Sequence, residues 1–377
     1  MTVNAKHSFK HGQLIALATV IFLSPSLRLF PAGSAELAGR VAWLSALAAG
    51  PVMLLYFLFL FKFMDAREEG EGLAELTLRA LGDRAGKIAL YVIPLWLLLY
   101  AGFVLRSGAD RLITTIYPLS APPFFTVTMG LVSLIAALGS ARSLVRVAKL
   151  VLPAVAGVLL LILIFAMFNI DKANLLPVTG QDAGPLLMGA LPVINVISVV
   201  IYMICFLVGP TPKEPGRLRD YTVWLAVLCL LLTALCTAVV GCFGPELTAR
   251  LTRPFFSLVR NLVFFNSVER IEALVVTLWV FPDFLLVSLL LFSAQFCLRL
   301  AMGSSPAYDG EKKLDMADRR WVIPLCGAVA IICGLLVAPD PASLELWSEK
   351  VIPGINLLFA FVVLPAIWAV GKLRKAL

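Results

Sequence analysis

The sequence predicts an all-α polytopic membrane protein with about ten transmembrane helices, arranged as a 5+5 inverted repeat in which helices 1 and 6 are discontinuous. Of its 377 residues, 60% are hydrophobic and only 14% are charged, which gives a mean hydropathy of +0.95. Apolar runs of about 18 or more residues, the length that crosses a bilayer, recur along the chain. The third observation is a Ser24-Pro25-Ser26 triplet in the middle of the first run. A proline in mid-helix cannot donate its backbone hydrogen bond, and such breaks in membrane helices accompany ligand or ion sites.

The apolar runs are separated by polar or proline-containing segments, and these set the expected boundaries. We expect spans at about 12–31, 41–61, 88–116, 122–139, 149–168, 185–208, 221–243, 268–300, 321–338 and 351–370. Between the second and third spans, leucines at positions 73, 76, 78 and 81 predict a short amphipathic helix. The segment 244–266 is too polar to span, and we expect it on the outer face as a gate or a docking surface.

The sixth span repeats the features of the first, because Pro192, Asn195 and Ser198 interrupt its first half. Breaks in spans one and six of ten indicate two five-helix halves of inverted topology. We therefore expect a single transporter-like domain over 1–377, with a first repeat at about 12–168 and a second at about 185–370.

Lysine and arginine concentrate in both chain ends and in the loops after the second, fourth, sixth and eighth spans. The excess of positive charge in cytoplasmic loops predicts that both termini lie in the cytoplasm. Basic cytoplasmic loops and chain ends thus account for the net charge of +8, and we expect the lipid bilayer rather than nucleic acid as a partner. The sequence holds no phosphate loop, catalytic triad or metal-ligand spacing, so we expect neither an enzyme nor a cofactor.

Two sets of charged residues fall within spans. Arg106 and Asp110 are four residues apart near the outer end of span three. They could pair, but we favour side chains that reach the interface. Asp283 follows Pro282 near the middle of span eight, and a carboxylate at that depth should face a cavity or a partner. Glu269 and Glu272 share its helical face.

Three stretches resemble one known family. They are Phe22–Pro31 followed by Ala38–Ser45, Gly244–Ala249 with Arg253-Pro254, and Val268–Ala273 running into Trp279. They are similar to the spore germination permeases, the B subunits of nutrient germinant receptors, within the amino acid/polyamine/organocation (APC) transporter superfamily. The resemblance implies a LeuT/APC-like fold. The chain departs from the family pattern at Ser24 and Ser26, where glycines are usual, and in span six after its break.

The resemblance also implies a site and a function. A small germinant such as an amino acid would bind in a central cavity, at Ser24, Pro25, Ser26, Tyr100, Asn195 and Ser198. Asp283 would bind a proton or cation next to Ser24–Ser26, with Glu269 and Glu272 at the entrance. The alternative for Asp283 is a protonated carboxyl bonded to backbone freed by Pro282.

The expected function is that of the membrane subunit of a germinant receptor, which triggers spore germination. Its partners would be an A-type membrane subunit and a C-type lipoprotein, in the spore inner membrane or the cell membrane. One alternative is a proton- or cation-coupled amino acid transporter of the cell membrane. The other is a ligand-blind structural or ion-conducting subunit of the receptor complex.

Overall fold

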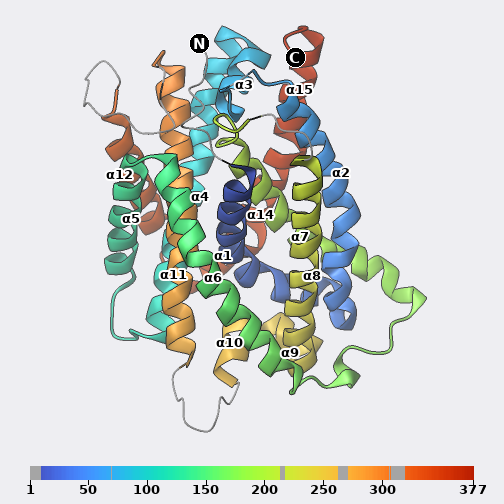
Figure 1. Cartoon of the computed structure of the whole chain (residues 1–377). Helices are drawn as coiled ribbons and strands as arrows, with labels where there is room; N and C mark the ends of the chain where they lie inside the picture. Colours follow the sequence, from blue (N-terminus) through green and yellow to red (C-terminus); the bar gives the residue numbers. More distant parts are fainter. Residues whose placement is uncertain (1–9, 69, 213–216, 262–270, 305, 307–318) are drawn as a thin grey trace.

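The structure, a computed structural model, describes residues 10–68, 70–212, 217–261, 271–304, 306 and 319–377. Within these ranges the chain is helical, and its long helices run roughly side by side (Figure 1). The first half contains α1 (His11–Ala38), η2 (Gly39–Leu44), α2 (Ser45–Asp65), α3 (Leu73–Leu81), α4 (Asp83–Thr115), α5 (Pro122–Leu138) and α6 (Ala141–Met167). Two short 3-10 turns, η3 (Lys172–Asn174) and η4 (Gly180–Asp182), lead to the second half.

The second half contains α7 (Ala183–Cys205), α8 (Arg217–Phe243), α9 (Pro245–Arg250), α10 (Pro254–Asn261), α11 (Ile271–Ala301), α12 (Val322–Leu336) and α13 (Pro341–Leu346). The last helix continues through α14 (Ile352–Leu358) and α15 (Leu364–Leu373), with π-helical turns at η6 (Trp347–Val351) and η7 (Phe359–Val363).

The described residues contain seven helical segments that are long and apolar enough to cross a membrane. Three shorter apolar helices, His11–Leu27, Pro122–Leu138 and Val322–Leu336, fall where the sequence predicts the first, fourth and ninth spans. The other seven match the remaining predicted spans, so the protein is an integral multi-pass membrane protein.

Helices α1 and α7 are not interrupted, contrary to the prediction for spans one and six. The helix runs through Pro25 and Pro31 in α1 and through Pro192 in α7. A proline removes one backbone donor, and nearby side chains can satisfy the groups that it disturbs. Pro25 removes the helical donor to the carbonyl oxygen of Ile21. In the same turn, the carbonyl oxygen of Leu23 accepts from Ser26 Oγ at 3.2 Å and from Trp279 Nε1 at 3.3 Å.

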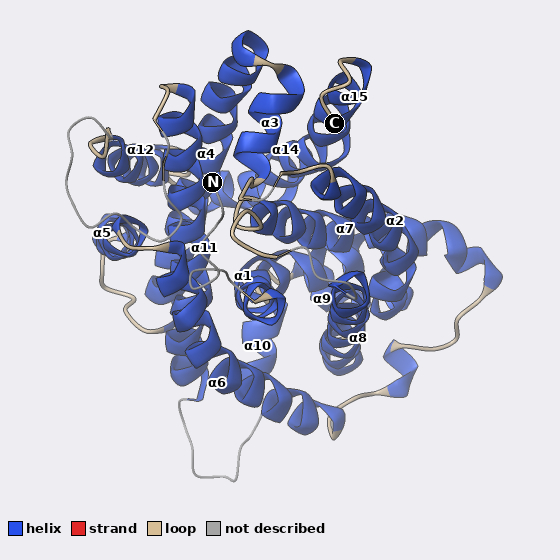
Figure 2. Cartoon of the chain, turned by 45° about the horizontal axis from the view of Figure 1, so that its top comes forward, coloured by secondary structure: helices blue, strands red, loops and turns tan. Residues whose placement is uncertain are grey.

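Helices α1 and α7 pack against each other. Ser34 Oγ donates to the carbonyl oxygen of Gly189 at 2.7 Å, and a Cβ atom on Gly33 would lie 3.2 Å from Pro192 Cγ. Helix α1 is seen almost end-on near the centre of Figure 2, and it packs against α6, α7, α8, α9, α10 and α11. The residues of α1 are therefore at the core of the molecule.

One end of the molecule carries the C-terminus and α3, at the top of Figure 1. His11 Nε2 lies 2.9 Å from the carbonyl oxygen of Pro212, so α1 begins at this end. Buried Arg67 donates to the carbonyl oxygens of Gly209 at 3.2 Å and Thr211 at 2.9 Å, which ties the segment after α2 to the segment after α7.

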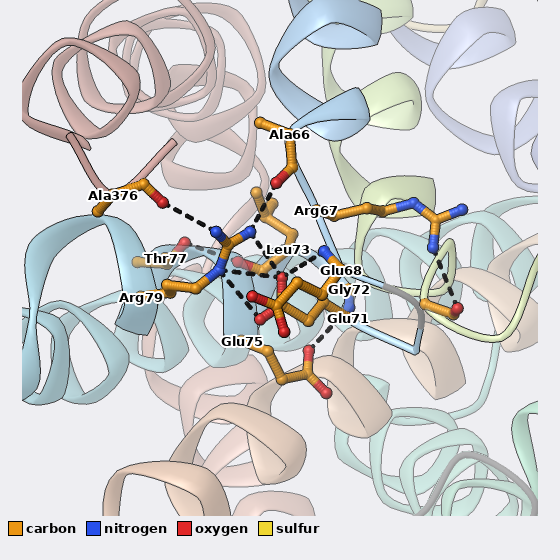
Figure 3. Close-up of polar contacts among 11 residues, drawn as sticks. Ala66, Arg67, Glu68, Glu71, Gly72, Leu73, Glu75, Thr77, Arg79 and Ala376 are labelled. Carbon is orange, nitrogen blue, oxygen red and sulfur yellow. Dashed lines mark hydrogen bonds and ion pairs between the residues drawn. The ribbon is translucent and has the colours of Figure 1, made fainter. Parts of the chain in front are cut away.

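Arg79 on α3 fastens the C-terminal end of the chain to the same region, as Figure 3 shows. Its guanidinium pairs with Glu71 at 2.8 Å and donates to the carbonyl oxygens of Ala66 at 2.6 Å and Ala376 at 2.8 Å. Helix α3 packs its apolar face against α4 and α15, so the predicted amphipathic helix lies on protein. Helices α9 and α10 lie at the opposite end (Figure 1).

Candidate functional site

A buried ion pair joins three helices in the core. The Arg111 guanidinium, from α4, pairs with one carboxylate oxygen of Asp283, on α11. The other carboxylate oxygen accepts a hydrogen bond from the Ser24 hydroxyl, on α1. Asp283 and Ser24 are each 2% exposed and Arg111 is 4% exposed, so the pair is shielded from solvent.

Local sequence makes room for this carboxylate. Gly108 lies one turn before Arg111 on α4, and a Cβ atom there would be only 3.1 Å from Asp283 Oδ2 and 3.0 Å from Met129 Cε. The glycine lets α4 and α11 approach closely at the level of Asp283. The prediction that Asp283 faces a partner is consistent with this arrangement, and the partner is an arginine that the sequence did not single out.

A second charged group lies at the C-terminal end of α4. Asp110 pairs with Arg106, with Nη1 3.6 Å from Oδ1, and with Arg253 from the segment before α10. Arg253 also donates to the Thr114 hydroxyl. The pairing of Arg106 with Asp110 that their spacing allows is observed. The favoured expectation, that Arg106 reaches the interface, is wrong. Its side chain is buried because Nε donates to the carbonyl oxygen of Ala338 at 2.8 Å.

Helix α10 covers the buried ion pair with aromatic rings. The Arg111 guanidinium carbon lies 5.6 Å from the centre of the Phe256 ring, a cation–π distance. Phe255 and Phe256 pack against Trp279 with ring centres 5.5 and 6.2 Å apart, and Trp279 donates to the carbonyl oxygen of Leu23. The predicted gate segment is thus in direct contact with α4 and α11 and, through Trp279, with α1.

The other predicted ligand residues are all buried. Pro25 lies within α1, and the Ser26 hydroxyl bonds to its own helix. On α7, Ser198 Oγ donates to the carbonyl oxygen of Asn195 at 2.9 Å. The side-chain oxygen of Asn195 is buried and accepts no hydrogen bond from the residues that the structure describes. Tyr100 stacks between Trp96 and Phe103, with ring centres 5.6 and 6.5 Å apart.

A polar chain that the sequence analysis missed extends from the predicted residues. Trp96 Nε1 donates to Tyr202 at 3.2 Å, and the Tyr202 hydroxyl donates to Asn356 Oδ1 at 3.4 Å. Tyr202 lies one turn beyond Ser198 on the same face of α7, a spacing that could have identified it. Asn356 lies three residues before Phe359, the first residue of the π-helical turn η7, and π-bulges often mark functional sites.

Two predicted acidic residues cannot be placed beside this site. Glu269 lies outside the described residues, and the side chain of Glu272 is likewise not described. An apolar cavity does lie within the described part of the chain, between α1, α2, α7 and α8, near His11, Phe57, Cys205 and Tyr221. None of the six predicted ligand residues lines it.

The sequence matches the profile of the spore germination protein family, the spore permeases, over residues 9–340. The chain belongs to this family. The resemblance inferred from the three sequence stretches is therefore confirmed. A search of curated proteins finds no significant match to this spore permease.

Solved transporter structures share the fold of this spore permease. A Na+-coupled sialic acid symporter, in a substrate-bound outward-open state, superposes with a TM-score of 0.60 at 13% identity, covering 93% of this chain and 79% of the symporter. Mhp1, a nucleobase-cation-symport-1 family transporter with bromovinylhydantoin bound, gives a TM-score of 0.58 at 15% identity, covering 94% and 80%. The predicted all-α, transporter-like fold class is confirmed, except that α1 and α7 are continuous.

Proposed function

We propose that this protein is the membrane subunit of a spore nutrient-germinant receptor, which binds a small germinant such as an amino acid and thereby triggers germination. Membership in the spore permease family supports this proposal. The observation that carries it is the set of buried polar groups where α1, α4, α7 and α11 meet, including the Asn195 oxygen without a hydrogen-bond donor.

The germinant would bind between α1 and α7, at Ser24, Pro25, Ser26, Tyr100, Asn195 and Ser198. Because α1 is unbroken, the carboxylate of an amino acid would bond to the serine hydroxyls rather than to free backbone amides. The Asn195 oxygen is a suitable acceptor for the ammonium group. Tyr100, stacked on Trp96, would form one wall.

Asp283 would couple germinant binding to ionisation, by exchanging a proton or its cationic partner, with Glu269 and Glu272 nearer the entrance. Its contact with Ser24 supports this assignment, because a change at the carboxylate is transmitted directly to α1. We further propose cytoplasmic termini, in the spore inner membrane or the cell membrane. The A-type membrane subunit and the C-type lipoprotein would be the partners.

A carrier function is the second candidate, because both solved structures described above are named as symporters or cation-symport transporters. The discriminating experiment measures binding of labelled amino acids to the purified chain and their uptake into proteoliposomes. Binding without uptake supports the receptor, and concentrative uptake supports the proton- or cation-coupled amino acid transporter. Neither binding nor uptake would refute both in favour of a ligand-blind structural or ion-conducting subunit.

The position of the site is tested by Asn195→Ala. Loss of a hydrogen bond to a charged group costs about 1.5–3 kcal/mol, so affinity should fall by about 10- to 100-fold. Ser133→Ala is the matched control, because Ser133 Oγ on α5 is also buried and has no hydrogen-bond partner within the described part of the chain. Equal effects of the two substitutions would count against Asn195 as a ligand residue.

A further inference from the structure

The charge of Asp283 is already balanced within the protein. Its two carboxylate oxygens are taken by the Arg111 guanidinium and by the Ser24 hydroxyl. Among the residues that the structure describes, Arg111 makes no other ion pair, and its buried Nε has no acceptor. The Arg111 guanidinium therefore forms its ion pair with the Asp283 carboxylate.

A dissolved cation at Asp283 would have to lie beside this guanidinium. Two like charges a few ångströms apart repel strongly in a poorly solvated site. The three helices also leave little room, since the carboxylate already lies close to Gly108 of α4. The transporters that share this fold are named for Na+ or for a cation, whereas here an arginine side chain meets the carboxylate.

We propose that the Arg111 guanidinium is the resident cation of the crossing of α1, α4 and α11, and that the protein binds no Na+ or K+ at Asp283. The inference rests on the proposed function only in treating Asp283 as the coupling group. The inference restricts the proposed coupling at Asp283 to a proton or to Arg111, because a metal cation then has no role at this carboxylate.

The same guanidinium connects this crossing to α10. Its charge lies over the Phe256 ring, and Phe256 packs on Trp279, whose indole bonds to the carbonyl oxygen next to Ser24. A dissolved ion could enter and leave without moving α10. A side chain held by both Asp283 and Phe256 instead makes the position of α10 depend on the ion pair.

The test uses the purified full-length chain and no germinant, so it remains informative if the proposed function is wrong. Thermal unfolding is followed by tryptophan fluorescence in chloride salts of Na+, K+ or N-methylglucamine at equal ionic strength. We expect the same apparent unfolding temperature in all three. A saturable rise in Na+ or K+ that Asp283→Asn abolishes would overturn the proposal.

Two variants test the guanidinium itself. Arg111→Ala leaves a buried carboxylate unpaired, so the unfolding temperature should fall by about 4–6 °C, and added guanidinium ion at low concentration should restore part of the loss. Arg146→Ala, on the exposed face of α6, is the control and should have no such effect.

If Arg111→Ala does not fold, the double variant Arg111→Met/Asp283→Leu keeps the proposal testable. It should fold, because both buried charges are gone. Rescue of Arg111→Ala by Na+ as effective as rescue by guanidinium, or failure of the double variant to fold, would contradict the assignment.

Discussion

Helices α4 and α12 meet backbone to backbone, and this contact permits a sharp prediction about Gly102. A Cβ atom on Gly102 would lie 2.6 Å from the backbone nitrogen of Gly334 and 2.7 Å from the carbonyl oxygen of Ala330. Ordinary contacts of a Cβ atom begin at 3.4 Å. Gly102→Ala therefore forces the two helices apart by about 0.8 Å, the difference between 3.4 and 2.6 Å, because backbone atoms cannot rotate out of the way.

Overpacking of this kind costs about 1–3 kcal/mol, and the rigid backbone on both sides places Gly102→Ala near the upper end. The better helix propensity of alanine returns roughly 1 kcal/mol, which leaves a net loss of about 2 kcal/mol. An unfolding entropy of about 2.1 cal/mol/K per residue amounts to about 0.8 kcal/mol/K for 377 residues. The apparent unfolding temperature should thus fall by about 2–3 °C.

The assay compares Gly102→Ala with Gly157→Ala in the same detergent, again by tryptophan fluorescence. Gly157 lies on the exposed face of α6, where a Cβ atom would meet no other atom within 4 Å. Gly157→Ala should leave the unfolding temperature unchanged or slightly raised. If Gly102→Ala proves as stable as Gly157→Ala, then α4 and α12 do not approach each other as described.

Two further predictions concern the proposed site and the segment that covers it. Ser26 is fully buried, so Ser26→Leu should block the germinant response, or uptake by a carrier, while the protein still reaches the membrane; an unchanged dose–response curve would remove Ser26 from the site. Cysteines placed at exposed Glu246, Arg250 and Arg260 should react with a membrane-impermeant thiol reagent added from outside, whereas a cysteine at buried Thr248 should stay protected. Protection at all four positions would contradict an outer location for α9 and α10.

The long apolar runs made most of the fold predictable, because a bilayer accepts few alternatives to a helix of about 20 residues. The proline within the first apolar run was correctly noticed, but the predicted helix break at Ser24–Ser26 is wrong. Whether a proline breaks or only disturbs a helix depends on its tertiary neighbours. One neighbour that bonds to the backbone beside Pro25, the Trp279 indole, lies 256 residues away in sequence from Leu23.

The candidate site was predictable only in part, for a similar reason. Asp283 could be identified because a lone carboxylate in an apolar run requires a partner. Arg111 could not, since it lies near the end of α4, where a charged side chain ordinarily reaches the interface. Its burial depends on Asp283 from another helix and on Phe256 from α10, and no local pattern in the sequence encodes either contact.

The separation of Arg111 and Asp283 also matters while the protein is being made. The two residues lie 172 positions apart in the chain. A ribosome adding 5–20 residues per second needs roughly 10–35 s to synthesise that length. Throughout this interval α4 has left the ribosome with an arginine whose carboxylate does not yet exist. Insertion of α4 therefore has to tolerate an unmatched charge near the helix end, which costs less than the roughly 2.5–3.5 kcal/mol that applies at the centre of a membrane helix. Only the synthesis of α11 supplies the carboxylate that pairs with this arginine.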